Sequence, residues 1–152
     1  MTPSVSFALI ASGVFLMSGM LTGVWKYLCM TRSANTDGKA EAPMYVDIAH
    51  RTSLMYSFAA LVVAKFAELS PWSANVTLVS TVAPIVFFGL SIAIYIVHGF
   101  LNDTDNQLKK PHKLGKRTIS GLFVHGFMWA LIVAEIGGFA VLLCGAIKTL
   151  TA

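Results

Sequence analysis

The chain has 152 residues, of which 56% are hydrophobic and only 12% are charged, and its mean hydropathy is +0.72. This balance excludes an ordinary soluble globular domain and is typical of an integral membrane protein. The formal net charge of +4 does not indicate nucleic-acid binding, because the basic residues cluster at the ends of apolar segments, where they report membrane topology.

Four apolar segments are long enough to cross a bilayer, which requires roughly 20 mostly apolar residues per helix. They cover about residues 5–29, 48–70, 76–101 and 119–148. We therefore predict an all-α fold in which residues 1–152 form a single membrane domain, a four-helix transmembrane bundle.

The first segment, 5–29, is predicted to stay in the protein as a helix rather than to act as a cleaved signal peptide. No basic residue precedes it, whereas a signal peptide begins with a basic region. Gly19 and Gly23 form a small-residue packing face that leads to Trp25, an interfacial anchor.

Proline and capping residues predict the boundaries of the other helices. Asp47 is expected to cap the second helix, and Pro71 is expected to follow its end. Pro84 lies inside the third helix, where it removes a backbone donor and favours a bend. Thr118 or Ser120 is expected to cap the fourth helix.

The basic residues predict the orientation in the membrane. Nine of the eleven Lys and Arg residues flank or occupy the first and third connections. The positive-inside rule places these two connections in the cytoplasm and both termini on the non-cytoplasmic side, most simply in a bacterial cytoplasmic membrane. The third connection, 102–118, is expected to contact anionic lipid headgroups through its five cations, and His112 within it is expected to be solvated.

Histidines and tyrosines within the apolar segments are the candidate functional residues, because polar groups at membrane depth are costly. His50 lies near the start of the second segment, Tyr95 and His98 lie in the last two turns of the third, and His125 lies near the start of the fourth. At 1.5 Å per residue, all four fall within roughly 10 Å of the cytoplasmic interface. Tyr56 lies somewhat deeper.

These histidines allow three roles: axial ligation of a haem, donation to a substrate, or hydrogen bonding within the bundle. His50 shares its helix face with Ser53 and Ser57, which are small enough to leave room for a flat macrocycle. His98 and His125 each have a small neighbour as well. Composition alone therefore does not choose among the three histidines.

A second pair of polar residues lies deeper in the bilayer. Lys65 and Glu135 are both expected about 25 Å from the cytoplasmic ends of their helices. The simplest prediction is an ion pair that joins the second and fourth helices and is shared by Glu68. A proton path is the alternative, although the sequence offers no further residues along such a line.

Two short motifs resemble those of a known family. Asp47-Ile-Ala-His50 opens the second segment and Tyr95-Ile-Val-His-Gly-Phe100 closes the third. Both resemble the styrene oxide isomerases and the related hydroxylaminobenzene mutases, in which an Ala-His pair and a tyrosine followed five residues later by phenylalanine occupy these places. The spacing of 45 residues between His50 and Tyr95 is similar, and the likeness extends over all four helices in length and order.

The resemblance implies a homotrimer that binds haem b at its subunit interfaces, with His50 as the axial ligand. It implies that ferric iron acts as a Lewis acid on a small hydrophobic epoxide, which becomes a carbonyl compound without net redox change. Tyr95 would then orient or polarise the substrate. Tyr56 departs from the family, which has asparagine at this place, because a phenol offers one donor where an amide offers two donors and an acceptor.

Two further functions are predicted as alternatives to the isomerase. In a b-type cytochrome, two of His50, His98 and His125 would ligate one iron for electron transfer. The second alternative is a rearrangement like that of the hydroxylaminobenzene mutases, or a non-catalytic subunit of a membrane complex in which the histidines are structural.

Overall fold

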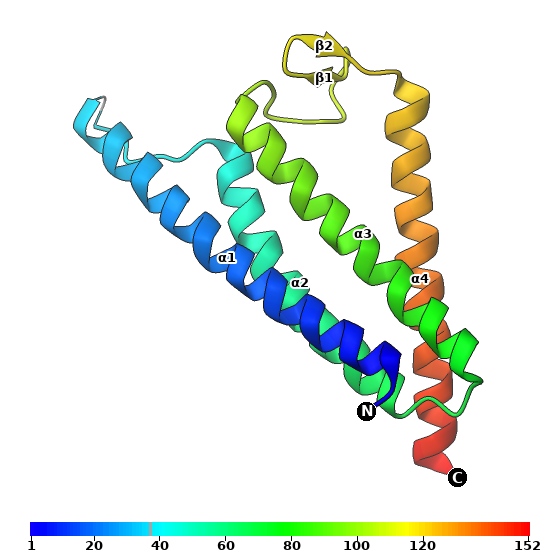
Figure 1. Cartoon of the computed structure of the whole chain (residues 1–152). Coiled ribbons are helices and arrows are strands. Elements are labelled where there is room, and N and C mark those ends of the chain that lie inside the picture. The colour runs from blue at the N-terminus through cyan, green and yellow to red at the C-terminus, as the bar shows by residue number, and fades with distance from the viewer. Residues whose placement is uncertain (37) are drawn as a thin grey trace.

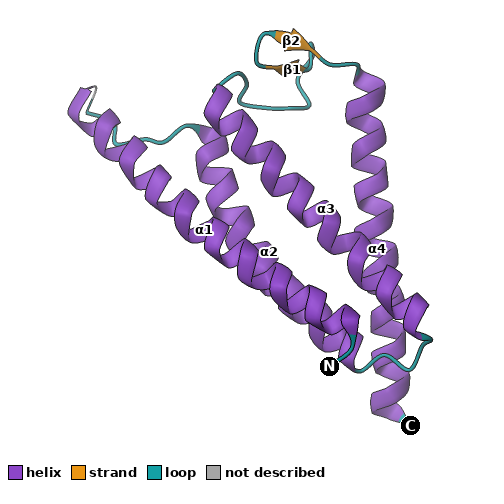
Figure 2. Cartoon of the chain, viewed as in Figure 1, coloured by secondary structure: helices purple, strands orange, loops and turns teal. Residues whose placement is uncertain are grey.

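The protein is described by a computed structural model that covers residues 1–36 and 38–152 (Figures 1 and 2). Its helices are α1 (Pro3–Thr36), α2 (Met44–Glu68), α3 (Ala74–Leu101) and α4 (Gly121–Thr151). Two short antiparallel strands, β1 (Lys113–Leu114) and β2 (Arg117–Thr118), form a hairpin between α3 and α4. The prediction of an all-α fold with four helices is confirmed.

The start of α2 differs from the prediction. The helix begins at Met44, after Pro43, so Asp47 lies in its first turn and is not the capping residue. The Asp47 carboxylate instead lies 2.5 Å from Lys26 Nζ of α1 and 2.6 Å from Arg51 Nη2. Asp47 therefore joins two helices at this end of the bundle.

Among the other boundaries, the end of α1 shows the largest difference from the prediction. Helix α1 continues to Thr36, seven residues beyond the predicted end, and α2 ends at Glu68, before Pro71. Ser120 occupies the capping position of α4 without a side-chain capping bond, and Thr118 belongs to β2.

Helices α1 and α2 pack closely along most of their length because small residues meet between them. Ala8 and Ala60 are fully buried, and a Cβ atom at Gly19 would lie 2.6 Å from Leu54 Cδ2. The Ser12 hydroxyl donates to the Ser57 carbonyl oxygen at 2.9 Å. Close approach and polar contacts together make this pair the tightest part of the bundle.

Helix α4 contacts the rest of the bundle mainly near the chain termini. Its buried residues are Leu142, Gly145 and Ala146, and Trp72 Nε1 donates to the Val141 carbonyl oxygen at 2.9 Å. In Figure 1, α4 meets α3 near the two termini and diverges from it toward the β1–β2 hairpin. The divergence leaves space between α3 and α4 at the hairpin end.

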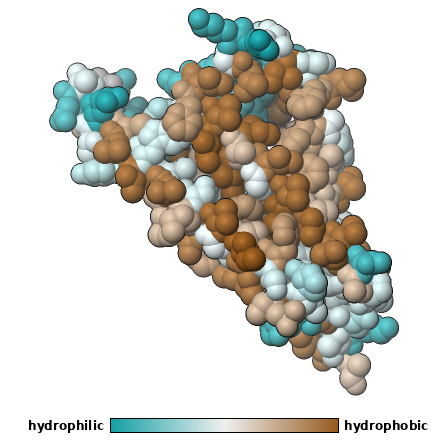
Figure 3. All heavy atoms as spheres, viewed as in Figure 1, coloured by the Kyte–Doolittle hydropathy of each residue, from teal (hydrophilic) through white to brown (hydrophobic). Residues whose placement is uncertain are grey.

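The outer surface of the helices is strongly apolar. Figure 3 shows hydrophobic residues along the length of the bundle and polar residues mainly at its ends. In the described part of the chain, α1, α3 and α4 are long and apolar enough to cross a membrane, whereas α2 does not meet that criterion. These helices indicate an integral membrane protein.

Candidate functional site

His50 lies in α2 and faces α1. Its Nδ1 atom is 2.8 Å from the Gly19 carbonyl oxygen. Since a carbonyl oxygen can only accept, Nδ1 bears the hydrogen and Nε2 bears the lone pair in the neutral ring. A Cβ atom at Gly23 would lie 2.8 Å from His50 Cε1, so the ring rests against a position that only glycine fits.

The helix face next to His50 is less open than the sequence predicted. Ser53 and Ser57 are buried, and their hydroxyls donate to the Ala49 and Leu54 carbonyl oxygens of their own helix, at 2.7 and 2.6 Å. Helix α1 packs over this face. His50 itself is only partly buried, and its Nε2 has no hydrogen-bond partner in the described part of the chain.

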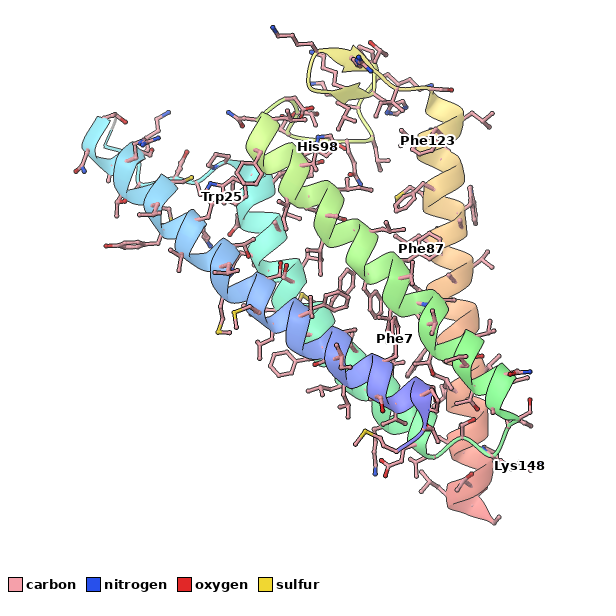
Figure 4. All side chains as sticks on the ribbon, viewed as in Figure 1. Phe7, Trp25, Phe87, His98, Phe123 and Lys148 are labelled. Carbon is pink, nitrogen blue, oxygen red and sulfur yellow. The ribbon has the colours of Figure 1, made fainter. Side chains whose placement is uncertain are left out.

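A cavity of about 320 Å³ lies between α3 and α4, beneath the segment that connects them. Tyr56 and Tyr95 line its wall together with His98 and His112, and most of the remaining lining is apolar. Figure 4 shows His98 near the hairpin end of α3 and Phe123, another lining residue, on α4. The structure thus brings both candidate tyrosines to one cavity, whereas His50 is not among its lining residues.

His98 belongs to a hydrogen-bonded clamp that the sequence did not reveal. Its Nδ1 lies 2.8 Å from Asp103 Oδ1, and both side chains are 5% exposed. The Gly115 amide donates to the other Asp103 oxygen. Asn102, with φ of 45°, adopts the left-handed conformation that ends α3 and turns the chain back toward His98.

The clamp favours the charged form of Asp103. Burial by itself would raise the pKa of this carboxyl, but the hydrogen bonds from His98 and the Gly115 amide outweigh burial and hold the pKa below its ordinary value of 3.8. A carboxylate accepts only, so His98 Nδ1 bears the hydrogen and His98 Nε2 is an acceptor in the neutral ring.

The prediction that His112 is solvated was wrong. The side chain is only 4% exposed, because the connecting segment folds over the cavity: the Gln107 amide donates to the Tyr45 hydroxyl at 2.6 Å, and His112 Nδ1 lies 3.1 Å from the Gln107 carbonyl oxygen. The ring stands edge-on to His125 at 5.7 Å, and His125 itself is exposed.

The three candidate haem ligands have separate surroundings. His50 contacts α1, His98 is paired with Asp103, and His125 contacts His112. Among the described residues, no group of three or more His, Cys, Asp or Glu side chains is placed to hold a metal ion. A cofactor that takes a single protein ligand, such as haem, remains compatible with this arrangement.

The predicted ion pair between Lys65 and Glu135 was wrong, whereas the predicted contact of Lys65 with Glu68 is confirmed. Lys65 Nζ lies 3.0 Å from Glu68 Oε2 on its own helix, and both side chains are exposed. Glu135 instead lines an apolar groove with Phe88 and Phe139, and its Oε1 has no partner among the described residues. Equal depth along two helices does not ensure that their side chains face each other.

Tyr56 and Tyr95 are held by aromatic contacts. The Tyr56 ring stacks on Phe88 with centroids 4.2 Å apart, and the Tyr95 ring lies 5.9 Å from Tyr45. These contacts restrain both phenols at the cavity wall.

Comparison of the chain with protein-family models, with curated proteins and with solved structures finds no match.

Proposed function

We propose that this chain is a four-span protein of the bacterial cytoplasmic membrane, in which α2 crosses the membrane as well as α1, α3 and α4. Helix α2 has 25 residues, which at 1.5 Å per residue reach roughly 37 Å, more than the hydrocarbon core of about 30 Å. Its charged side chains lie at its two ends in pairs, Asp47 with Arg51 and Lys65 with Glu68. The distribution of Lys and Arg supports cytoplasmic connections after α1 and α3, with both termini on the other side.

The proposed activity is the isomerisation of a small hydrophobic epoxide to a carbonyl compound, with ferric haem b bound through His50. The contact that supports it is the 2.8 Å hydrogen bond between His50 Nδ1 and the Gly19 carbonyl oxygen. Histidines that ligate metals commonly donate their other ring N–H to a carbonyl or carboxylate, which fixes the ring and leaves Nε2 for the metal. His50 fits a haem that takes one axial histidine.

The chain's own residues have defined roles in this activity. When bound, ferric haem would supply a Lewis acid for the epoxide oxygen. The Tyr95 hydroxyl donates a hydrogen bond to the same oxygen and stabilises the negative charge that develops as the C–O bond breaks. The Tyr56 phenol orients the substrate from the same cavity. The apolar walls exclude water, which would divert the opened epoxide to a diol.

The proposal requires more than one chain. Because His50 is not among the residues that line the cavity with Tyr95, a site that combines them needs His50 from one subunit and the cavity of a neighbour. A homotrimer, as the family resemblance implies, meets this requirement. Leu122 and Trp129 of α4 are 84% and 67% exposed in the single chain, so a large apolar surface is available to lipid or to a neighbouring subunit.

The absorption spectrum of the protein purified with added haem tests the cofactor. We expect a Soret band equivalent to one haem per chain, its loss in His50→Ala, and its retention in the control His125→Ala. A six-coordinate low-spin spectrum that requires two histidines would favour the b-type cytochrome. A protein without a Soret band would favour the non-catalytic subunit.

Turnover of styrene oxide tests the activity. Tyr95→Phe is expected to reduce the rate about 10- to 100-fold, as the loss of one oxyanion donor typically does, while the spectrum is retained. If a haem-loaded protein leaves epoxides unchanged but rearranges an aryl hydroxylamine, the mutase-like activity replaces the isomerase. An unchanged rate in Tyr95→Phe would remove this residue from the mechanism.

A further inference from the structure

Two histidines that line the cavity between α3 and α4, His98 and His112, each have an Nε2 atom with no hydrogen-bond partner among the described residues. His98 is 4% exposed and lines the cavity, and its Nδ1–H donates a hydrogen bond to Asp103. Among the described residues, its Nε2 has no hydrogen-bond partner. Of these two atoms in the described part of the chain, His112 Nε2 is fully enclosed by protein, whereas His98 Nε2 is not.

The clamp fixes the tautomer of the neutral His98 ring. The Asp103 carboxylate accepts from His98 and from the Gly115 amide, so the imidazole cannot reverse its tautomer without losing the bond to Asp103. In the neutral ring, Nε2 therefore presents a lone pair. An acceptor at the wall of a mostly apolar cavity favours an occupant that supplies a donor.

The size and the walls of the cavity restrict that occupant. A dry cavity of about 150 Å³ holds a benzene molecule, so the volume of about 320 Å³ accepts a molecule with one or two rings. The walls include Phe123 and Phe127 of α4 and Tyr95 of α3, which favour stacking or edge contacts with an aromatic ring.

We propose that this cavity binds a small aromatic molecule with an O–H or N–H donor, such as a phenol, and that the donor bonds to His98 Nε2. An epoxide or an aldehyde has acceptors only and cannot make this bond. The site therefore selects a ligand class that the proposed isomerase does not require. The proposal shares the cavity with the proposed function but does not depend on haem.

Binding of two matched probes to the full-length protein in lipid nanodiscs tests the proposal. The probes are para-fluorophenol and para-fluorotoluene, which have similar shapes but differ in the donor, and fluorine NMR reports their binding. We expect the phenol to bind about tenfold more tightly than the toluene after correction for partition into protein-free nanodiscs, as one buried hydrogen bond allows.

Variants of three residues distinguish the contribution of His98 Nε2 from that of the cavity as a whole. His98→Asn keeps a donor for Asp103 but has no Nε2, so we expect it to lose the preference for the phenol while its helical content and thermal stability stay close to the wild type. The control His125→Asn changes an exposed histidine outside the cavity and should keep the preference. Val124→Trp fills the cavity and should abolish binding of both probes.

Two outcomes would overturn the proposal. If the wild type and His98→Asn show the same preference, water satisfies Nε2 and the acceptor does not select the ligand. If Val124→Trp binds both probes as the wild type does, the probes occupy lipid and not the cavity. His50→Ala separates this proposal from the proposed function, because it should remove haem and leave phenol binding unchanged.

Discussion

The α1–α2 interface and the α3–α4 interface pack apolar helices differently. Between α1 and α2, glycine, alanine and serine meet, and Gly19 and Gly23 bring the helix backbones close to Leu54 and His50. Between α3 and α4, large aromatic residues such as Phe123 face a cavity that the connecting segment covers. Small residues therefore close one interface and hold His50 in place, whereas the interface with bulky residues contains a cavity.

The largest effect is expected at Asp103, which holds the 102–120 segment over the cavity. Asp103→Ala removes the acceptor from His98 Nδ1–H and from the Gly115 amide, and opening of the 102–120 segment should become easier by about 3 kcal/mol, since two hydrogen bonds to a carboxylate are lost. Trypsin cleavage at Lys113 and Lys116 measures this opening. The control Asp105→Ala changes an exposed carboxylate in the same segment and should leave the cleavage rate unchanged.

The same clamp should depend on pH. Because the pKa of folded Asp103 lies below its ordinary value of 3.8, the stabilisation is fully present above that value and is lost as the pH falls through the folded pKa. Amide hydrogen exchange at Gly115 should therefore remain protected down to about pH 4 and lose protection below it. Loss of protection between pH 7 and pH 5 would show that another group controls the clamp.

A smaller effect is expected at the closed interface. Gly19→Ala places a Cβ atom 2.6 Å from Leu54 Cδ2 and 3.2 Å from the Leu54 backbone nitrogen, which should destabilise the protein by about 1–2 kcal/mol. Gly13 of the same helix has nothing within 4 Å of an added Cβ, so Gly13→Ala should be neutral or stabilising by up to about 1 kcal/mol. Thermal unfolding in detergent measures both, and equal effects would contradict close packing at Gly19.

The smallest effect is expected at the two ion pairs of Asp47, one with α1 and one within α2. Asp47 contacts Lys26 and Arg51, but all three side chains are partly exposed. Asp47→Asn should lower the free energy of unfolding by roughly 0.5–1 kcal/mol, and added salt should reduce the difference because it screens exposed charges. A difference that persists at high salt would indicate that the carboxylate acts through a buried hydrogen bond.

The sequence predicted the four helices well because each apolar run is long and ends in polar residues, turns or proline. It did not predict contacts that depend on rotation about the helix axes. Lys65 was expected to pair with both Glu135 and Glu68, yet it pairs only with Glu68 among the described residues, since depth along a helix leaves the direction of a side chain undetermined.

The connecting segment was the least predictable part of the candidate site. Its polar composition indicated a solvated loop, and His112 was interpreted accordingly. The fold of the segment depends on contacts between distant residues, such as the bond from the Gln107 amide to the Tyr45 hydroxyl. The pairing of His98 with Asp103 was accessible in principle, because His98 lies in the last turn of α3 and Asp103 directly follows Asn102, the residue that ends the helix.

Replacement of the His50 side chain by free imidazole tests most directly the claim that His50 ligates haem. His50→Gly should bind little haem, and addition of imidazole should restore the wild-type absorption spectrum, because imidazole can occupy the space beside Gly19 and Gly23 and present a nitrogen to the iron. The control His98→Gly should bind haem without imidazole. Full haem occupancy of His50→Gly in the absence of imidazole would contradict the assignment of His50 as the axial ligand.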